Sequence, residues 1–554
     1  MDGLPVDIEL LGNLLDRDTC LIVTDDDIHL LGGQLGAATA TARSLFGLAI
    51  QGTAAPMLEC RFVGLTNTCF CFVVTTRESH HSFFRSPVLH RAEQGSCLLR
   101  PRMPGRRAGD RVKAMAHQDP AAQAEIDVVE FCRDLIRIDT TNWGEGRAKG
   151  EREAAEYCAA VMREAGLQPE LFERPDGPDR TSVVARMAGT DPDAGALVVH
   201  GHLDVVPAQA EDWEVDPFSA ELIDGLIWGR GAVDMKNMDA MILASLLRMA
   251  RDGHRPKRDI IFAFFADEED NGAYGARWLT DTHPELFAGA TEAISEVGGF
   301  SADIAGNRAY LIQTGEKGIH WTKMIADGTA GHGSAIHSDN PVVNLAEAVT
   351  AIGNHEWPLH YTKTTRALFE QLSELTGIPF DPEDPSELIE ATGSTGKFIA
   401  ATLRNTSNPT LLQAGYKHNV VPGTAEALVD ARTLPEQDAA VASTLAELAG
   451  EKIRFELLNE GISLEVPFSG ALVEQMVASL RAEDPEAVVL PYMLGGGTDN
   501  KHLATLGITG YGFAPLRLPA DLDFTGMFHG VDERVPVDAL TFGVRVLHRF
   551  LADQ

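Results

Sequence analysis

The sequence predicts an α/β fold in which helices cover a mostly parallel sheet, with a smaller α+β module inserted into it. Two observations predict this. Between residues 115 and 318, short continuous apolar runs alternate with helical patterns, as in parallel sheets buried on both faces. Between residues 319 and 467, the strand patterns alternate apolar and polar residues, which indicates a sheet with one open face.

Length and charge narrow the class of protein. The chain has 554 residues, too many for one hydrophobic core, and its 44% hydrophobic and 23% charged residues are ordinary for a soluble protein. The net charge of -35 argues against nucleic acid and anionic membrane surfaces as partners, because like charges repel. The charge does not indicate what the substrate is.

The first 114 residues differ from the rest. They hold 12 basic and 12 acidic residues and five of the seven cysteines, whereas the remainder holds 34 basic and 69 acidic residues. We expect residues 1–114 to be an N-terminal extension that is poorly ordered or not part of the native protein. A large body with only two cysteines is typical of a cytoplasmic protein without a disulfide framework.

The first part of the catalytic domain is expected over residues 115–318. Ile126, Val129 and Ile136 fall at helical spacing. Three buried strands are predicted by the runs ALVVHGHLD (196–204), RDIIFAFFADEE (258–269) and EAISEVGG (292–299). Between the first two, NMDAMILASLLRMARDG predicts a helix that ends at Gly253.

The inserted module is expected over residues 319–467. Its order is strand, helix, two strands, helix, strand, which is a split βαβ or ferredoxin-like arrangement. The helices are predicted by PVVNLAEAVTAIG (341–353) and EQDAAVASTLAELAG (436–450). The α/β pattern returns over residues 468–554, which we expect to be the second part of the catalytic domain.

Possible metal ligands follow the strands of the larger domain. The carboxyl ends of parallel strands meet at one sheet edge, where ligands bind. Histidines and carboxylates without cysteine suit a divalent ion, zinc first, and their number suits two ions that share a carboxylate. The candidate positions are His202, Asp204, Asp234, Asp267, Glu268, Glu269, Glu296 and His529.

The adjacent acids Glu268 and Glu269 suggest two different roles, one in metal binding and one in proton transfer. Successive side chains of an extended segment point in opposite directions. One carboxylate could then bind an ion while the other removes a proton from an activated water and passes it to the leaving nitrogen.

Five motifs together resemble the M20 family of co-catalytic zinc metallopeptidases and amidohydrolases. They are GHLDVVP, WGRGAVDMK, FADEE, SEVGG and HGVDE, in that order. The resemblance runs from about residue 120 to 554 and is highly specific as a set. The family includes glutamate carboxypeptidase, aminoacylase, carboxypeptidase S and succinyl-diaminopimelate desuccinylase. GGGTDNKHL resembles the branch of carboxypeptidase S and N-acyl-amino-acid hydrolases.

The resemblance implies two Zn²⁺ ions, with Co²⁺ or Mn²⁺ as alternatives. It implies five ligands: Asp234 between both ions, His202 and Glu296 on one ion, and Glu269 and His529 on the other. It also implies that Glu268 is the general base and acid, and that Asp204 orients His202.

The same resemblance implies that the inserted module is a lid domain, through which family members often dimerise. It implies that His332 reaches the active site of a partner subunit and stabilises the oxyanion there. Asn419 and Arg432 would bind substrate, with Arg432 holding a carboxylate. The stretch from about 361 to 400 is long for the family and is expected to reshape the substrate mouth.

We therefore expect a dinuclear zinc hydrolase that cleaves an amide bond, in a peptide or an N-acyl amino acid, next to a free carboxylate. A desuccinylase or deacetylase of amino-acid biosynthesis, of the succinyl-diaminopimelate or acetylornithine type, stays open as an alternative. A catalytically inactive metal-binding regulatory protein is the alternative of another class, and the intact Glu268 argues against it.

Overall fold

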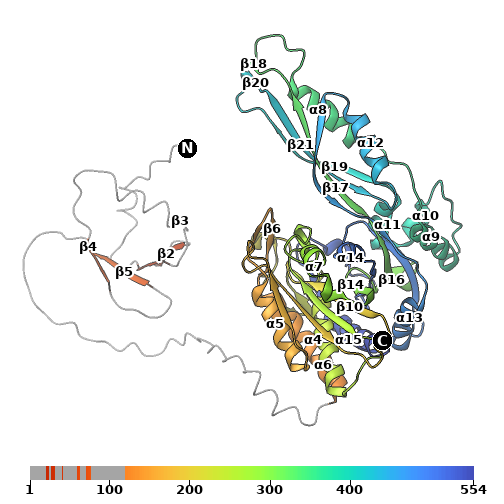
Figure 1. Cartoon of the computed structure of the whole chain (residues 1–554). Helices are drawn as coiled ribbons and strands as arrows, with labels where there is room; N and C mark the ends of the chain where they lie inside the picture. The colour runs from red at the N-terminus through yellow and green to blue at the C-terminus, as the bar shows by residue number, and fades with distance from the viewer. Residues whose placement is uncertain (1–19, 24–26, 32–39, 42–58, 63–69, 76–118) are drawn as a thin grey trace, which may run out of the picture. The chain divides into compact units, whose positions relative to one another are not determined.

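The computed structural model describes residues 119–554 in full and, before them, only the backbone of five short strands (Figure 1). These strands form one antiparallel sheet in the order β3-β2-β1-β5-β4: β1 (Cys20–Val23), β2 (Asp27–Leu31), β3 (Ala40–Thr41), β4 (Glu59–Phe62) and β5 (Phe70–Thr75). They belong to a compact unit of their own, Met1–Gly105, separate from Arg106–Gln554. The rest of the predicted extension lies outside the described residues.

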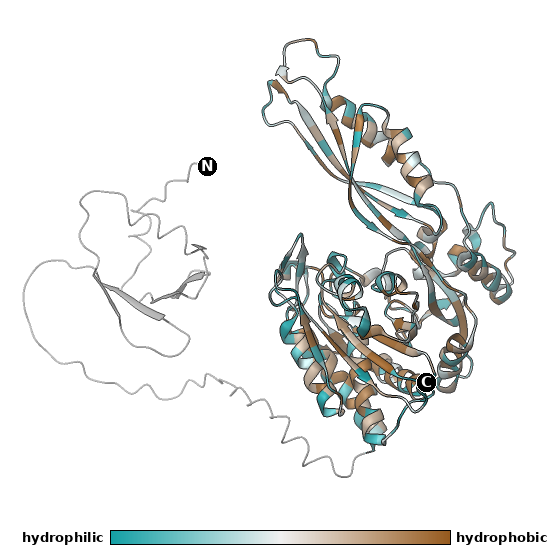
Figure 2. Ribbon diagram, viewed as in Figure 1, coloured by the Kyte–Doolittle hydropathy of each residue, from teal (hydrophilic) through white to brown (hydrophobic). Residues whose placement is uncertain are grey.

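A ten-stranded sheet organises the larger unit. Its centre is parallel and consists of β13 (Ile260–Phe265), β10 (Ala196–His202), β14 (Ala290–Ser295) and β25 (Thr509–Gly512). The mostly parallel centre and the three expected strands β10, β13 and β14 are confirmed. Every residue of β10 and β13 is buried, and Figure 2 shows the strands of this sheet as largely hydrophobic.

Strands that pair mainly antiparallel flank this centre. On one side lie β9 (Thr181–Met187) and β8 (Glu170–Glu173). On the other side β16 (Asn307–Glu316) pairs antiparallel with β25, β15 (Phe300–Ile304) and β23 (Leu464–Glu465), and parallel with β24 (Val488–Leu494).

Helices cover both faces of the sheet. The main core lies under α4 (Pro120–Arg137), α5 (Arg152–Glu164), α6 (Lys236–Asp252), α13 (Ala471–Glu483) and α15 (Val537–Ala552). A second core on the other face lies under α7 (Ala276–Thr282) and α14 (Asn500–Ala504). Helix α6 ends at Gly253 in the left-handed conformation, as expected. Among the helices of the described residues, none combines the length and the apolarity that a membrane crossing needs.

The predicted helix at residues 126–136 is part of α4. Of the three residues noted at helical spacing, Ile136 is buried, Val129 packs against the main core and Ile126 is 48% exposed. Val128, Phe131 and Leu135 are also buried, and α4 contacts α6 and α15. The buried face of α4 therefore includes more than the noted residues and leaves out Ile126.

The smaller module spans residues 318–461. Its antiparallel sheet has the order β19-β21-β17-β22, from β17 (Gly318–Asp327), β19 (Thr406–Ala414), β21 (Thr424–Thr433) and β22 (Ile453–Gly461). Helices α8 (Pro341–Gly353) and α12 (Asp438–Ala449) pack on one face around Met324, Leu345 and Leu445. The other face carries Trp321 and Arg432, which contact each other.

The long stretch between α8 and β19 leaves this module and returns to the larger domain. It forms α9 (Lys363–Thr376), α10 (Ser386–Ala391) and α11 (Gly396–Ala400). Leu368, Phe369 and Ile399 join the main core, and α9 and α11 contact β24. This segment therefore connects the two parts of the fold instead of extending the module's own sheet.

Three short strands bring distant loops together near the carboxyl edge of the large sheet. β12 (Leu226–Trp228) pairs with β11 (Glu221–Ile223) on one side and with β26 (Arg534–Pro536) on the other. The chain before β26 therefore runs beside the chain that follows β12. β6 (Asn142–Gly144) and β7 (Arg147–Ala148) form a separate hairpin.

Candidate metal centre

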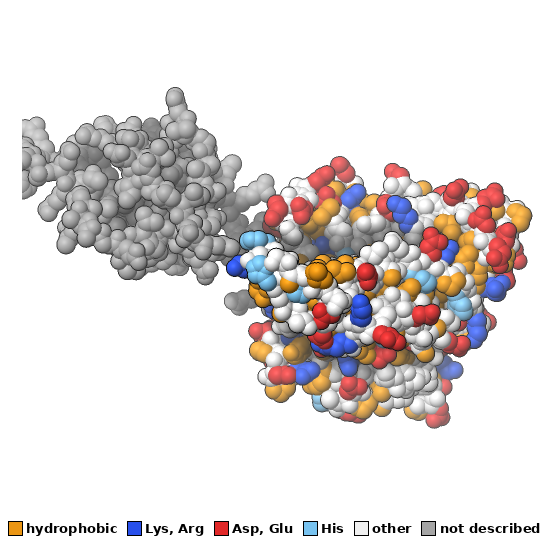
Figure 3. All heavy atoms as spheres, turned by 90° about the horizontal axis from the view of Figure 1, so that it is seen from above, with side chains coloured by type: hydrophobic (Ala, Val, Ile, Leu, Met, Phe, Trp, Pro, Cys, Tyr) orange, Lys and Arg blue, Asp and Glu red, His pale blue; other side chains and the backbone are white. Residues whose placement is uncertain are grey.

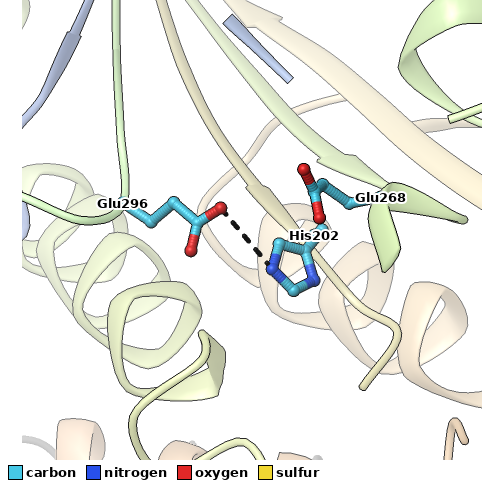
Figure 4. Close-up of side chains that lie close together, drawn as sticks. All are labelled: His202, Glu268 and Glu296. Carbon is cyan, nitrogen blue, oxygen red and sulfur yellow. Dashed lines mark ion pairs between the residues drawn. The ribbon is translucent and has the colours of Figure 1, made fainter. Parts of the chain in front are cut away.

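The expected acidic and histidine side chains converge at the carboxyl edge of the central sheet. His202 is the last residue of β10, and Glu296 directly follows β14. Glu268 and Glu269 lie in a short 3-10 turn, η2 (Glu268–Asp270), after β13. Figure 4 shows His202, Glu268 and Glu296 turned toward one another from these three strand ends.

Asp234 lies between the two histidines. Its Oδ1 is 3.0 Å from Nε2 of His202, and its Oδ2 is 3.3 Å from Nε2 of His529. Glu296 Oε1 is 3.6 Å from the first imidazole nitrogen, and Glu269 Oε2 is 3.2 Å from the second. The carboxylate of Asp234 therefore lies against both imidazoles, with Glu296 near His202 and Glu269 near His529.

The protonation of His202 shows that this arrangement suits a cation. Its Nδ1 is 2.9 Å from the carbonyl oxygen of Asp204, and a carbonyl only accepts, so Nδ1 carries a proton. Nε2 then faces the carboxylates of Asp234 and Glu296. Burial lowers the pKa of His202, but the neighbouring carboxylates outweigh burial and raise it well above its usual value. Either a proton or a metal ion must sit between these groups.

The carboxylates of the cluster also require a proton or a metal ion between them. Burial and the charge of Asp234 raise the pKa of Glu269 to about 7 and raise the pKa of Glu296 well above its usual value. Hydrogen bonds to Asp234 and Glu269 raise the pKa of His529 to about 11. Burial raises the pKa of Asp234, and the hydrogen bonds from the two histidines lower it by more.

Two groups of donor atoms lie within metal-binding reach of one another. Ligand atoms of His202, Glu268 and Glu296 lie within 4.8 Å of one another, as do those of His202, Asp234 and Glu269. Imidazole and carboxylate donors without sulfur suit borderline to hard divalent ions. The residues therefore fit a cluster of divalent cations.

The carboxylate of Asp204 organises the turn that carries the two glutamates. It accepts hydrogen bonds from the backbone N–H of Glu268 and of Glu269, both at 3.1 Å, and from Nδ2 of Asn142 at 2.9 Å. Its closest carboxylate approach to Nδ1 of His202 is 3.6 Å. Asp204 thus contacts His202 mainly through its carbonyl, and it also holds the loop after β13.

Sequence reasoning missed a buried network behind this turn. Asp267, in the left-handed conformation at φ 68°, accepts hydrogen bonds from Arg180 and Asn142. Arg180 Nε also donates to both carboxylate oxygens of Glu151 at 3.0 Å. Of the acids in FADEED, Asp267 is therefore a structural residue. No local signal marks Asn142, Arg180 or Glu151, because each lies 87 or more residues before Asp267.

A second missed residue, Glu533, links the loops of Asp234 and His529. Its carboxylate accepts the backbone N–H of Gly231 at 2.8 Å and of Val233 at 3.2 Å, and it forms an ion pair with Arg230. The side chain of Glu533 is fully buried. Its place in the motif HGVDE was the signal that could have identified it.

Glu268 has a cationic neighbour. Its Oε1 is 3.7 Å from Nζ of Lys501, and the side chains are 11% and 4% exposed. Sequence reasoning assigned no role to Lys501.

The three expected substrate-binding residues fall into two places. His332 and Asn419 are adjacent, because β18 (Gly331–His332) pairs with β20 (Val420–Val421) and the N–H of Gly333 donates to the carbonyl of Asn419 at 2.9 Å. Arg432 pairs with Ile319 near the start of β17, whereas β18 follows the end of that strand. At the rise of a β-strand, the eight residue steps from Ile319 to Asp327 separate the two places by about 27 Å.

Comparisons with known proteins identify the family. The model of Peptidase family M20/M25/M40 matches residues 198–553. Over 449 residues, which make up 76% of this chain and 84% of the relative, the chain is 28% identical to the N-fatty-acyl-amino acid synthase/hydrolase PM20D1 of Xenopus tropicalis. Over 443 residues, 77% of this chain and 95% of the relative, it is 27% identical to aminoacylase-1 of Homo sapiens.

Solved structures share the fold. The M20 family metallo-carboxypeptidase Sso-CP2 from Sulfolobus solfataricus is 18% identical with a TM-score of 0.60, covering 77% of this chain and 98% of that one. A Bacillus subtilis protein described as a dinuclear metal binding peptidase is 15% identical with a TM-score of 0.51, covering 78% and 98%. The expected family and enzyme class are confirmed: the chain belongs to Peptidase family M20/M25/M40 and is a metal-dependent hydrolase of that family.

Proposed function

We propose that the chain binds two divalent cations, zinc first, and cleaves the amide bond of an N-acyl amino acid next to a free carboxylate. The observation that carries the proposal is Asp234, whose two oxygens face His202 and His529 separately. His202 and Glu296 would complete one ion site, and Glu269 and His529 the other. When bound, the ions would polarise the amide carbonyl and make a water molecule more acidic.

Glu268 is the group in this cluster that is free to move a proton. It lies beside the ligands, but its carboxylate pairs with Lys501, whereas that of Glu269 pairs with an imidazole. A carboxylate in this place can take a proton from the attacking water and deliver it to the leaving nitrogen. Asp204 fixes the backbone of Glu268 and so holds this carboxylate in reach of the cluster.

Aromatic side chains beside His529 favour an apolar acyl group. Phe528 directly precedes His529. Its ring stacks on that of Phe398, which lies on α11, with 6.4 Å between the ring centroids. Its centroid lies 5.6 Å from that of Phe524. Phe398 also contacts Tyr492 at 5.9 Å. The relative PM20D1 is named for N-fatty-acyl amino acids. These features support an N-acyl amino acid with a hydrophobic acyl chain as substrate.

Arg432 is proposed to bind the substrate carboxylate. Its guanidinium holds the carboxylate of Asp430 with two hydrogen bonds, at 2.7 and 3.0 Å, and lies 5.8 Å from the ring of Trp321. Burial and the charge of Arg432 lower the pKa of Lys317 to about 7, so the amine of a lysine lies near this guanidinium. A planar guanidinium matches a carboxylate with two parallel bonds, and a substrate carboxylate would exchange with Asp430.

The small module, residues 319–467 of the sequence, is proposed to be a lid and dimerisation domain. Its end distant from Arg432 carries exposed His332, whose Nδ1 is 2.8 Å from Oγ of Ser334, and exposed His418. Figure 3 shows histidine side chains gathered at one end of the surface seen from above. An exposed imidazole far from its own carboxylate-binding residue suits a role in a second copy of the chain, and so supports a homodimer.

Metal binding should release protons. In the ion-free cluster, His202 and His529 carry protons at neutral pH, and Glu269 loses its proton near pH 7. Because ions bind the deprotonated ligands, affinity should fall as pH falls, and more protons should be released at pH 6 than at pH 8. Titration calorimetry of the chelator-treated protein with Zn²⁺, Co²⁺ and Mn²⁺ in two buffers of different ionisation enthalpy counts these protons. Binding without proton release would contradict the proposed ligands.

Glu268→Gln should retain both ions but lose turnover. The amide keeps the size of the side chain and cannot accept a proton, and general acid–base catalysis contributes roughly 10²- to 10⁴-fold. Metal analysis and rates with N-acyl amino acids test this. The matched control is Glu285→Gln, the same change in the exposed turn η3 (Pro284–Phe287), which leaves the cluster untouched. Near wild-type kcat for Glu268→Gln would refute the assigned role.

Phe398→Ala should raise KM for long-chain N-acyl amino acids by roughly 10- to 150-fold, because burying apolar surface near the acyl chain contributes about 1.5–3 kcal/mol per large side chain. KM for N-acetyl amino acids should change little. Phe380→Ala is the control, because Phe380 lies in the same inserted segment but contacts Tyr361 and Phe369. Equal KM changes for short and long acyl groups would contradict the acyl assignment.

Subunit mixing tests the role of His332. Glu268→Gln and His332→Ala chains should each be nearly inactive, and a hybrid dimer should contain one complete site. Random reassociation makes half of the dimers hybrid, so activity should recover to about a quarter of wild type. A mixture no more active than the sum of its parts would show that His332 does not act across subunits.

A further inference from the structure

Lys501 is a buried lysine for which the proposed chemistry has no role. It lies on α14, its side chain is 4% exposed, and its ammonium group is 3.7 Å from Glu268 Oε1. Within the described part of the chain, no other lysine or arginine forms an ion pair with Glu268. A buried lysine is costly unless it is paired, so its position beside this one glutamate requires an explanation.

The acids around Lys501 come from three different parts of the chain. Glu268 belongs to η2, Glu316 is the last residue of β16, and Asp499 precedes α14. Glu316 accepts hydrogen bonds from the backbone N–H of Thr498 at 3.1 Å and from its hydroxyl at 2.9 Å. Burial raises the pKa of Glu316 to about 8 and that of Asp499 well above its usual value, and the charge of Lys501 lowers both by less than burial raises them. Lys501 is thus a cation placed among three acids.

The stem of Lys501 also packs where the small module joins the larger domain. A Cβ added to Gly461, the last residue of β22, would lie 3.7 Å from Cδ of Lys501, and one added to Gly497 would lie 3.6 Å from Nζ. Glu316 ends β16, and β17 starts at Gly318. The strand that enters the module and the strand that leaves it both pass Lys501.

A second contact joins the same parts. Nδ2 of Asn271, in the turn after Glu268, donates a hydrogen bond of 2.6 Å to Oδ1 of Asn459 on β22. The turn that carries Glu268 is therefore bonded to β22 directly through Asn271, and Lys501, which pairs with Glu268, lies close to Gly461 of the same strand. A shift of β22 would move both contacts.

We infer that Lys501 is a positioning residue that holds the Glu268 carboxylate in its working orientation and couples that orientation to the join between the small module and the larger domain. This inference rests on the proposed role of Glu268 as the proton-transferring group. It predicts an effect on turnover and not on binding, because Lys501 acts through Glu268 and not on the substrate.

The test compares charge removal with charge conservation. Lys501→Met keeps the stem and removes the ammonium; kcat should fall about 10- to 100-fold, as for other residues that support a catalytic group. KM and metal content should stay within about threefold of wild type, as is expected for a residue that touches neither substrate nor ion. Lys501→Arg should recover most of kcat. Lys452→Met is the control, because Lys452 bonds Asn344 in the small module, away from the cluster.

Three outcomes would overturn the inference. An unchanged kcat in Lys501→Met would do so, as would a raised KM with unchanged kcat, which would make Lys501 a substrate-binding residue. An equal loss in Lys501→Arg and Lys501→Met would show that the charge is irrelevant. If Lys501→Met does not fold, Lys501→Gln removes the charge with a polar side chain and is judged by the same criteria.

A separate variant tests the coupling between the turn that carries Glu268 and the join of the small module to the larger domain. Asn459→Ala removes the direct bond to Asn271 and should lower kcat by a smaller factor, with KM unchanged. Combined with Lys501→Met, its effect should be less than multiplicative, because both changes release the same turn. Multiplicative effects would overturn the coupling. If Glu268→Gln stays active, the proposed function fails; if it is inactive while Lys501→Met matches wild type, only the present inference fails.

Discussion

One buried carboxylate, that of Asp234, lies against two imidazoles, and the rest of the site must keep these three groups in place. Asp234 can face His202 and His529 at about the same distance only if three separate loops keep fixed positions. Any loosening would leave buried carboxylates next to one another without a compensating positive charge, which is a costly state. The loops must therefore be held by groups other than the ligands.

Three further acids supply that support, and they act in the same way. Asp204 accepts the N–H groups of Glu268 and Glu269, Asp267 accepts the N–H of Tyr274, and Glu533 accepts the N–H groups of the loop before Asp234. A carboxylate that accepts several backbone bonds fixes a loop without needing a regular helix or strand. The acid-rich stretch after β13 therefore mixes supporting residues with candidate ligands.

The parts of the fold that could be predicted are those that local sequence determines. β10, β13 and β14 are continuous apolar runs, and Gly253 marks the end of α6, so each could be read from a short window. The full buried face of α4 could not, because the noted spacing does not mark Val128, Phe131 and Leu135, which tertiary packing buries. His202, Glu268, Glu269 and Glu296 could be found because they follow strand ends, whereas Asp234 and His529 are indicated by the motifs WGRGAVDMK and HGVDE.

The basic residues that pair with these acids could not be found in this way. Arg180 and Asp267 are 87 residues apart, Arg230 and Glu533 are 303 apart, and Lys501 lies 233 residues after Glu268. Each pair has meaning only after the sheet has brought its members together. An isolated Lys or Arg in a sequence is usually a surface residue, so its type alone carries no signal.

The placement of the proposed substrate-binding residues argues that one chain does not form the complete site alone. Arg432 lies near the join between the small module and the larger domain, while His332 and Asn419 lie together beyond the other end of β17. A rigid ten-residue strand between them keeps the two places apart wherever the module moves. Rotation at the join could bring one end toward the ion cluster, but not both. If His332 and Arg432 both act on one substrate, as proposed, the imidazole must come from a second copy of the chain.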